Sequence, residues 1–195
     1  MTRKAAPPQA EDNSRRAELV RTAARLFRDQ GYERTTVRDL GNAMGLQSGS
    51  MFYHFRNKEE ILVAVMALGI TSTTEQLAAA LEVAKTPYDK VSALIHVHLN
   101  SLLGENQAAL EVMLYEWRSV SAEQKPGLIV LRDRYEALWQ SALDEAAAAG
   151  VVGQDTRLLR RMVLGSLHWS VQWFRRDGGD SVDALAERML KLVIG

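Results

Sequence analysis

The sequence predicts an all-α protein of about nine helices in two domains. Apolar residues recur at intervals of three and four through most of the chain, which is the period of an amphipathic helix. No stretch alternates strictly between apolar and polar residues, and no Asn-Gly or Asp-Gly pair joins two such stretches into a hairpin. Capping residues and glycines divide the periodic pattern into separate helices.

Size and composition bound the class of protein. The 195 residues suffice to bury a core, as one or two compact units. The absence of cysteine excludes disulfides and thiolate metal sites. The N-terminal residues carry no apolar signal segment, and the longest apolar run (61–70) is about half of a membrane span. We therefore expect a cytoplasmic protein with no membrane partner.

The charge of the chain is zero overall but uneven. Residues 1–57 carry ten Lys and Arg against six Asp and Glu, whereas residues 58–195 carry fourteen against eighteen. A basic N-terminal part on an acidic body fits a small nucleic-acid-contacting unit. Random variation in surface charge gives the same small bias.

The N-terminal part begins with a polar, Pro-containing stretch, and we expect residues 1–12 to form a disordered arm. The first helix is predicted from about Ser14 to Gln30, and Gly31 ends it. Its inner face consists of apolar residues at helical spacing: Val20, Ala23, Ala24 and Phe27.

A helix-turn-helix is predicted next. Thr36 and Asp39 have the spacing of a capping box, so a short helix begins there. Gly45 supplies a left-handed turn, and a second short helix is predicted over residues 48–54. This unit places one helix end in the DNA major groove. A plain helical hairpin with a buried aromatic face is the alternative.

The second helix of this unit combines small, polar and aromatic residues suited to DNA. Gly49 and Ser50 let the backbone approach closely, and the helix N-terminus favours phosphate. Gln47 and Ser48 can read base edges. The aromatic rings can pack on thymine methyls, while His54 and Lys58 can contact phosphate. The candidates are Gln47, Ser48, Gly49, Ser50, Phe52, Tyr53, His54 and Lys58.

The larger part contains six more predicted helices. Asn57 with Glu60 forms a capping box for a helix that persists towards Val83. Thr86 followed by Pro87 marks the next start. A helix follows with Leu110, Met113, Leu114 and Trp117. Another begins at a capping box of Ser121 and Gln124 and runs to Gly150. The last two are predicted at about 155–176 and 180–193.

Aromatic residues in this part suggest a ligand pocket. An aromatic at helical spacing is more often core than pocket, but the larger domain carries many of them. His98 lies on the apolar face of its helix. It is either a core residue with its hydrogen bonds satisfied or a polar group that contacts a ligand inside a pocket. The candidate ligand-binding residues are His98, Met113, Trp117, Arg118, Tyr135, Trp139, Trp169 and Trp173.

Enzymatic and metal chemistry find no support in the sequence. His96 and His98 point to nearly opposite sides of a helix, which argues against a metal pair. No zinc-protease motif, catalytic carboxylate pair or phosphate-binding loop is present. We expect a non-enzyme without a cofactor.

The last two helices carry apolar seams suited to a homodimer. Gly165 would permit close helix approach, and a reader of DNA half-sites usually needs a partner copy. Burial within one subunit is the alternative. The predicted interface residues are Leu158, Met162, Gly165, Trp169, Leu185 and Met189.

The N-terminal pattern closely resembles the TetR family of bacterial transcriptional regulators. The matching segments are 23–27, 31–32, 35–40, 44–46, 49–50, 52–55 and 57–60. The resemblance implies a dimeric repressor with a DNA-binding domain (13–57) and a ligand-binding and dimerisation domain (58–195). It adds Thr36 and Arg38 to the DNA-contacting residues. Gln47 and Phe52 depart from the family pattern, which usually has Ser or Thr and Tyr there.

A weaker resemblance points to the effector. Segments 115–118, 132–135 and 164–174 are similar to a TetR subgroup that senses acyl-coenzyme A thioesters. That similarity implies an apolar or acyl-thioester effector, with Arg118, Arg132 or Arg134 near its phosphates. Ordinary surface ion pairing is the alternative for these arginines. The predicted function is a ligand-responsive repressor on a palindromic operator. A constitutive architectural DNA binder or a helical interaction module would be the alternatives.

Overall fold

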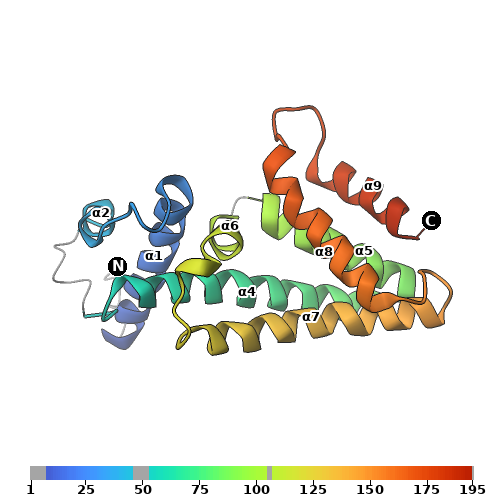
Figure 1. The fold of residues 1–195 in the computed structure, drawn as a ribbon, viewed down its shortest axis with the longest axis horizontal. Coiled ribbons are helices and arrows are strands. Elements are labelled where there is room, and N and C mark those ends of the chain that lie inside the picture. The colour runs from blue at the N-terminus through green and yellow to red at the C-terminus, as the bar shows by residue number, and fades with distance from the viewer. Residues whose placement is uncertain (1–7, 46–52, 105–106, 195) are drawn as a thin grey trace, which may run out of the picture.

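The computed structural model describes residues 8–45, 53–104 and 107–194, with side chains from residue 13 onwards. Within these ranges the chain folds into eight α-helices and one short 3-10 helix, and contains no strand (Figure 1). The predicted all-α class is confirmed. The predicted third helix (48–54) falls largely in residues 46–52, which lie outside the described part.

The N-terminal unit is built on α1 (Pro8–Gln30) and α2 (Val37–Ala43). α1 ends where predicted, at Gly31, whose φ of 83° is the left-handed conformation that glycine adopts readily. Its start differs, because the helix already begins at Pro8. Proline suits the first turn of a helix, where its missing N–H costs nothing. The expected disordered arm of residues 1–12 is therefore wrong over 8–12.

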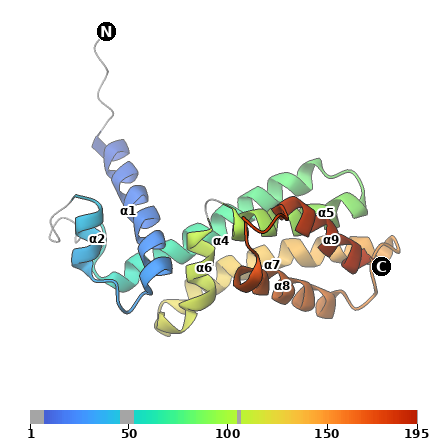
Figure 2. The same cartoon turned by 90° about the horizontal axis from the view of Figure 1, so that it is seen from above.

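The larger unit is arranged around α4 (Lys58–Val83), which packs against α1, α5, α6 and α7. α5 (Pro87–Leu103) and α7 (Lys125–Ala148) flank it, and α8 (Thr156–Trp173) packs on both. α9 (Val182–Ile194) lies along α5, as Figure 2 shows from above. The short α6 (Ala108–Tyr115) and η1 (Trp117–Ser119) stand between the N-terminal unit and the body.

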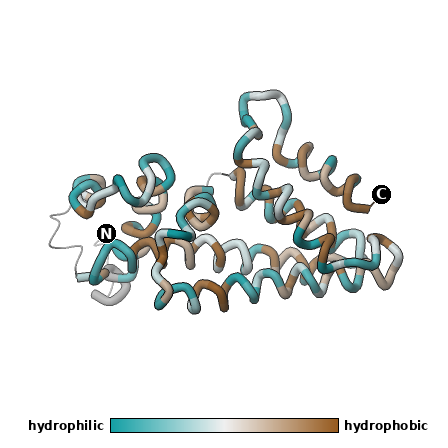
Figure 3. Tube along the Cα trace, viewed as in Figure 1, coloured by the Kyte–Doolittle hydropathy of each residue, from teal (hydrophilic) through white to brown (hydrophobic). Residues whose placement is uncertain are grey.

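A continuous apolar core runs from α1 through α4 to α9. α4 is long and apolar enough to cross a membrane by length and composition, but half of its most apolar stretch is buried against other helices. That burial is typical of the core helix of a folded protein. The loop between α8 and α9 is hydrophilic by contrast (Figure 3).

Two predicted helix starts have the expected caps. Thr86 caps α5 through its side chain, which accepts from the Asp89 N–H, and Pro87 follows at the first position. Asn57 caps α4 by accepting from the Glu60 N–H at 2.8 Å. The Glu60 carboxylate, however, accepts from the Arg56 N–H rather than from that of Asn57. The reciprocal half of the predicted capping box is displaced by one residue.

The predicted capping box of Ser121 and Gln124 is wrong. α7 begins at Lys125 without a side-chain cap, and Pro126 occupies its first turn. The Ser121 N–H donates instead to the Glu59 carboxylate at 2.7 Å. The last two helices differ slightly at their ends from the prediction, at 156–173 and 182–194.

Candidate functional site

The start of α2 is fixed by reciprocal hydrogen bonds. The Asp39 N–H donates to Thr36 Oγ1 at 3.1 Å, and the Thr36 N–H donates to the Asp39 carboxylate at 2.8 Å. Hydrogen bonds from the Thr36 hydroxyl and backbone hold the pKa of Asp39 below its ordinary value. The sequence therefore sets the first helix of the helix-turn-helix locally.

The turn after α2 agrees with its prediction, because Gly45 has a φ of 64°. The predicted DNA-contacting residues Gln47, Ser48, Gly49, Ser50 and Phe52 lie outside the described residues. Tyr53 is 79% exposed, and its ring meets that of His54 edge to face, with centroids 5.2 Å apart. Arg38 is exposed on α2, and Thr36 is exposed at its start. The described surface on either side of residues 46–52 is thus polar and aromatic.

Lys58 has a structural role that its sequence position did not predict. Its Nζ donates to the carbonyl oxygens of Tyr32 at 2.9 Å and Thr35 at 3.1 Å. The ammonium also lies 4.1 Å from the centre of the Tyr32 ring. These contacts direct the charge towards the loop between α1 and α2 rather than outwards. They join the start of α4 to the helix-turn-helix.

Two carboxylates fix the surroundings of the N-terminal unit. Glu116, just after α6, accepts from the Tyr32 N–H at 3.0 Å. Glu59, at the start of α4, accepts from the Ser121 N–H at 2.7 Å, and this bond lowers the pKa of Glu59. Residues far apart in sequence thus fix the position of the helix-turn-helix relative to α6 and α7.

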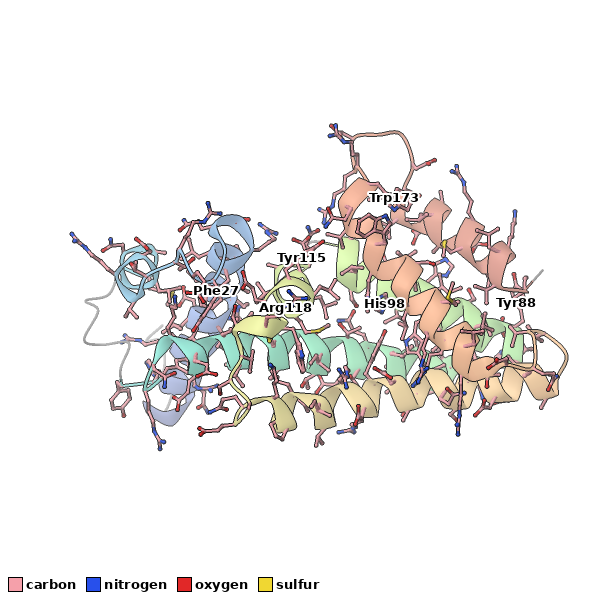
Figure 4. All side chains as sticks on the ribbon, viewed as in Figure 1. Phe27, Tyr88, His98, Tyr115, Arg118 and Trp173 are labelled. Atoms are coloured by element: carbon pink, nitrogen blue, oxygen red, sulfur yellow. The ribbon has the colours of Figure 1, made fainter. Side chains whose placement is uncertain are left out.

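A cavity of about 110 Å³ lies inside the body, between α4, α5, α6, α7 and α8. Figure 4 places His98 in this interior, whereas Trp173 projects from the end of α8. The lining surface is mainly apolar, although six of the twelve lining residues carry a polar group. Its residues are Ile70, Thr73, His98, Leu102, Leu110, Met113, Leu114, Arg132, Tyr135, Glu136, Leu164 and His168.

His98 and Tyr135 form the polar centre of the cavity. His98 Nδ1 and the Tyr135 hydroxyl are 2.6 Å apart, and both side chains are buried. His98 Nε2 has no hydrogen-bond partner among the described residues. The His168 ring lies 5.0 Å from the His98 ring, and the Trp139 indole meets His98 edge-on from behind.

Burial keeps both imidazoles neutral. It lowers the pKa of His168 to about 4, and it lowers the pKa of His98 well below its ordinary value with a smaller contribution from His168. Burial also raises the pKa of Tyr135, so the phenol keeps its proton. The indole N–H of Trp139 opposes that rise, although it makes no hydrogen bond of ordinary geometry. The cavity therefore contains no net charge at its polar centre.

Ion pairs form the polar edge of the cavity. Glu136 lies 3.5 Å from Arg132 Nε and 3.1 Å from Arg160 Nη1. The Arg132 guanidinium also lies 5.6 Å from the centre of the Trp117 ring. The charge of Arg132 is therefore paired, with Glu136 and with Asp133, rather than free.

One face of α8 carries a stripe of exposed apolar side chains, hereafter the α8 stripe. Its spacing of four, seven and four residues follows a single helical face. Trp169 is 66% exposed, and the other members are also exposed by more than half. The stripe consists of Leu158, Met162, Trp169 and Trp173.

Two family comparisons match most of the chain. The family described as "Bacterial regulatory proteins, tetR family" matches residues 19–65, which contain the helix-turn-helix. The family described as "Tetracyclin repressor-like, C-terminal domain" matches residues 84–195, which contain most of the cavity lining. The chain belongs to the TetR family. The resemblance found in the N-terminal sequence is thus confirmed for both domains.

Among solved structures, this TetR-family chain is similar to that of superantigen PfiT, with 47% identity over 93% of this chain and 96% of that one, and a TM-score of 0.82. PfmR, a TetR family transcriptional regulator from Thermus thermophilus, is 33% identical over 90% and 96% of the two chains, with a TM-score of 0.82. AibR, solved with isovaleryl coenzyme A and operator DNA, shares the fold at 23% identity over 92% and 98%, with a TM-score of 0.85.

Among curated relatives, the transcriptional repressor KstR2 from Rhodococcus jostii is 29% identical over 96% of this chain and 95% of its own. These TetR-family relatives are thus named mainly as regulators of transcription. No group of three or more His, Cys, Asp or Glu side chains within the described ranges is arranged to hold a metal ion.

The structure separates the predicted ligand-binding residues into two groups. His98, Met113 and Tyr135 line the cavity together. Trp139 is buried behind His98, and Trp117 is stacked on Arg132 outside the lining. Three others lie outside the lining of this cavity: Arg118, Trp169 and Trp173.

The predicted dimer residues differ in their exposure. Leu158, Met162 and Trp169 are exposed in the α8 stripe, and a side chain added at Gly165 would meet nothing within 4 Å. Leu185 is only 9% exposed, because α9 packs this face on α5. That packing corrects the prediction for Leu185, a core residue of its own subunit. Met189 is half-buried, and the neighbouring Leu192 is exposed.

Sequence reasoning missed three polar cavity residues: Thr73, Glu136 and His168. His168 follows Leu164 by four residues, so both lie on one face of α8. That spacing was the available signal for His168. Glu136 carried no local signal, since its partner Arg160 comes from a different helix.

The neutral histidines predict a loss of stability in mild acid. The unfolded chain protonates them near their ordinary pKa of 6.5, whereas folded His168 does so only near 4. Between these values the unfolded chain binds more protons, so the free energy of unfolding falls as the pH is lowered. The slope is at most about 1.4 kcal/mol per pH unit for each histidine. We expect His168→Gln to reduce this slope in melting curves between pH 6.5 and about 5.

His96→Gln is the control, because His96 is a half-buried histidine on α5 that faces Glu187 rather than the cavity. Its slope should match that of the unsubstituted protein. An unchanged slope in His168→Gln would contradict the assignment of a neutral, buried imidazole.

Proposed function

We propose that this TetR-family protein is a ligand-responsive repressor that binds a palindromic operator as a homodimer and leaves it when a small effector enters the cavity. Its place of action is the cytoplasm, where the operator is accessible. The central observation is the position of α6. This helix lines the cavity with one face and contacts the N-terminal unit with the other.

The two faces of α6 belong to different parts of the function. Leu110, Met113 and Leu114 line the cavity, so an occupant presses on them directly. On its other side, α6 packs on α1, and Glu116 at its end holds the Tyr32 N–H. A shift of α6 therefore changes the position of the helix-turn-helix. Since the effector acts through its different affinity for two shapes, coupling of about 1–3 kcal/mol is expected.

The homodimer is supported by the α8 stripe. A row of exposed apolar side chains along one helix face marks a contact surface. A second copy is the partner that fits, because two recognition helices about 34 Å apart reach successive major grooves. Changing that separation releases the DNA.

The effector that we propose is apolar or carries an acyl group as a thioester. The mainly apolar lining surface and the paired charges at the edge of the cavity support it. The likeness to AibR, solved with isovaleryl coenzyme A, adds weight to an acyl thioester. Only the acyl part would fit a cavity of about 110 Å³.

A gel-shift titration on the DNA upstream of its own gene tests the proposal. Real phosphate contacts give a loss of affinity of roughly 10³-fold or more between about 50 and 200 mM salt. A constitutive architectural binder would show the same salt dependence but no response to any effector. A helical interaction module would show no salt-dependent binding at all.

We expect Tyr53→Ala to weaken operator binding by about 10- to 100-fold, through loss of an aromatic contact at the groove. Tyr53 is 79% exposed, so the substitution leaves folding and the dimer intact. Tyr88→Ala is the control, because Tyr88 is an exposed tyrosine on the distant start of α5 (Figure 4). Fluorescence anisotropy on a labelled operator measures both. Equal affinity of the two variants would contradict the placement of Tyr53.

A second candidate function follows from the 47% identity to superantigen PfiT. That likeness favours testing the purified protein for stimulation of T lymphocytes. The regulator function has the stronger support, since both TetR-family descriptions match the chain. Stimulation at low protein concentration would establish the second activity, and its absence would remove it.

A further inference from the structure

In the polar centre of the cavity, one atom has no hydrogen-bond partner within the described ranges. Counting the protons of His98 and Tyr135 decides whether that atom donates or accepts a hydrogen bond. His98 Nδ1 and the Tyr135 hydroxyl are 2.6 Å apart, so one of them donates to the other. No described residue offers the Tyr135 proton another acceptor, and none pairs with His98 Nε2. The neutral imidazole carries a single proton, on either Nδ1 or Nε2. The position of that proton decides which ligand atom fits.

The two tautomers differ in the number of polar groups left unpaired. With the proton on Nε2, Tyr135 donates to Nδ1, and within this pair only the Nε2–H of His98 remains unpaired. With the proton on Nδ1, both the Tyr135 hydroxyl proton and the Nε2 lone pair remain unpaired. Because each buried unpaired polar group is costly, the first arrangement is the stable one. The free group of His98 is therefore a hydrogen-bond donor.

We propose that the cavity binds a compact, uncharged apolar group with one carbonyl oxygen, which accepts a hydrogen bond from His98 Nε2–H. This inference rests on the proposed function and specifies the effector of the same site. The carbonyl can belong to a free ketone or to the acyl group of a thioester. The charges of Arg132 and Glu136 in the lining are paired with each other, so a charged ligand would have to break an existing ion pair.

The volume sets the size of the occupant. At roughly 10–15 Å³ for each water-sized group, about 110 Å³ holds on the order of ten non-hydrogen atoms. The aliphatic side chains around the cavity suit a short carbon chain. A bulky polycyclic compound would require the helices to separate.

Matched probes of one size test the proposal on the full chain without DNA. Methyl pentyl ketone, hexanoate and the amine with the skeleton of the ketone differ mainly in the polar group. Isothermal calorimetry should give the ketone at least about tenfold tighter binding than the other two, as one buried hydrogen bond contributes about that factor. Butyryl coenzyme A in a parallel arm distinguishes the thioester from the free ketone as the source of the carbonyl.

The variants identify the donor. His98→Phe keeps an aromatic ring of similar shape but removes Nε2–H, so the affinity for the ketone should fall about tenfold. His96→Gln on the same helix should leave it unchanged, because His96 lies outside the cavity lining. Nitrogen-15 spectra of histidine-labelled protein should show the His98 proton on Nε2, a reading that is independent of any ligand.

Each alternative result would overturn the proposal. These are a proton on Nδ1, tighter binding of hexanoate or the amine, absence of ketone and thioester binding, or equal ketone affinity in His98→Phe. Operator binding is measured separately by gel shift. Failure there with intact ketone binding would refute the proposed repressor function and leave the ligand assignment standing.

Discussion

Trp169→Asp is expected to convert the protein to a monomer and to reduce operator affinity on the order of a hundredfold or more, since the two half-sites lose their linkage. Trp169 is 66% exposed in the middle of the α8 stripe, where the partner copy would cover it. An aspartate there places an unpaired charge in an apolar contact, which is strongly unfavourable. Analytical ultracentrifugation measures the dimer, and anisotropy on the operator measures the affinity.

Val130→Asp is the matched control. Val130 is also exposed, at 68%, but lies on α7 outside the α8 stripe. This variant should remain dimeric and bind the operator normally. If both variants remained dimers, the α8 stripe would not be the interface between copies.

Gly69→Leu is expected to lower the free energy of unfolding by about 1–3 kcal/mol, the usual cost of overpacking a core. A Cβ at Gly69 would lie 3.0 Å from the carbonyl carbon of Ala109 and 3.1 Å from the Leu110 nitrogen. Both neighbours are backbone atoms of α6, so the helix itself must move. Because α6 lines the cavity and holds the N-terminal unit through Glu116, the variant should also lose its response to effector.

Thermal melts of Gly69→Leu and Gly127→Leu form the comparison. Gly127 is an exposed helical glycine on α7, and a Cβ there meets nothing within 4 Å. Its replacement should leave the melting temperature unchanged or raise it slightly, because glycine disfavours helix. An undiminished effector response in Gly69→Leu would argue against α6 as the connection between cavity and operator.

The elements that the sequence predicted well are those fixed by neighbours in the chain. Thr36 and Thr86 cap helices through residues three positions away, and Gly45 ends α2 through its own backbone conformation. Such signals are complete within a few residues. The same is true of the apolar period that placed α4 to Val83.

The errors arise where a distant residue competes for a group. Ser121 fails to form its predicted cap because Glu59, 62 residues earlier, accepts from its N–H. Lys58 donates hydrogen bonds to carbonyl oxygens of a loop more than 20 residues earlier in the chain. The sequence around either residue does not predict these distant partners.

The cavity was predicted in part for the same reason. Periodicity places an aromatic residue on a helix but does not say whether its face meets the core, the cavity or a second copy. Trp139 lies behind the cavity, Trp173 lies on the surface, and Tyr135 lies in the lining. Only the packing of five helices distinguishes these three positions.

The hydrogen bonds that Lys58 and Glu116 make to the loop after α1 bear on the construction of hybrid regulators. Both side chains belong to the body, whereas the groups that they hold are the amide of Tyr32 and the carbonyls of Tyr32 and Thr35. Main-chain atoms are present whatever the side chains are. An N-terminal unit taken from another family member and joined before Lys58 can therefore make the same hydrogen bonds to Lys58 and Glu116. Its own loop must have the same length and no proline at the position of Tyr32.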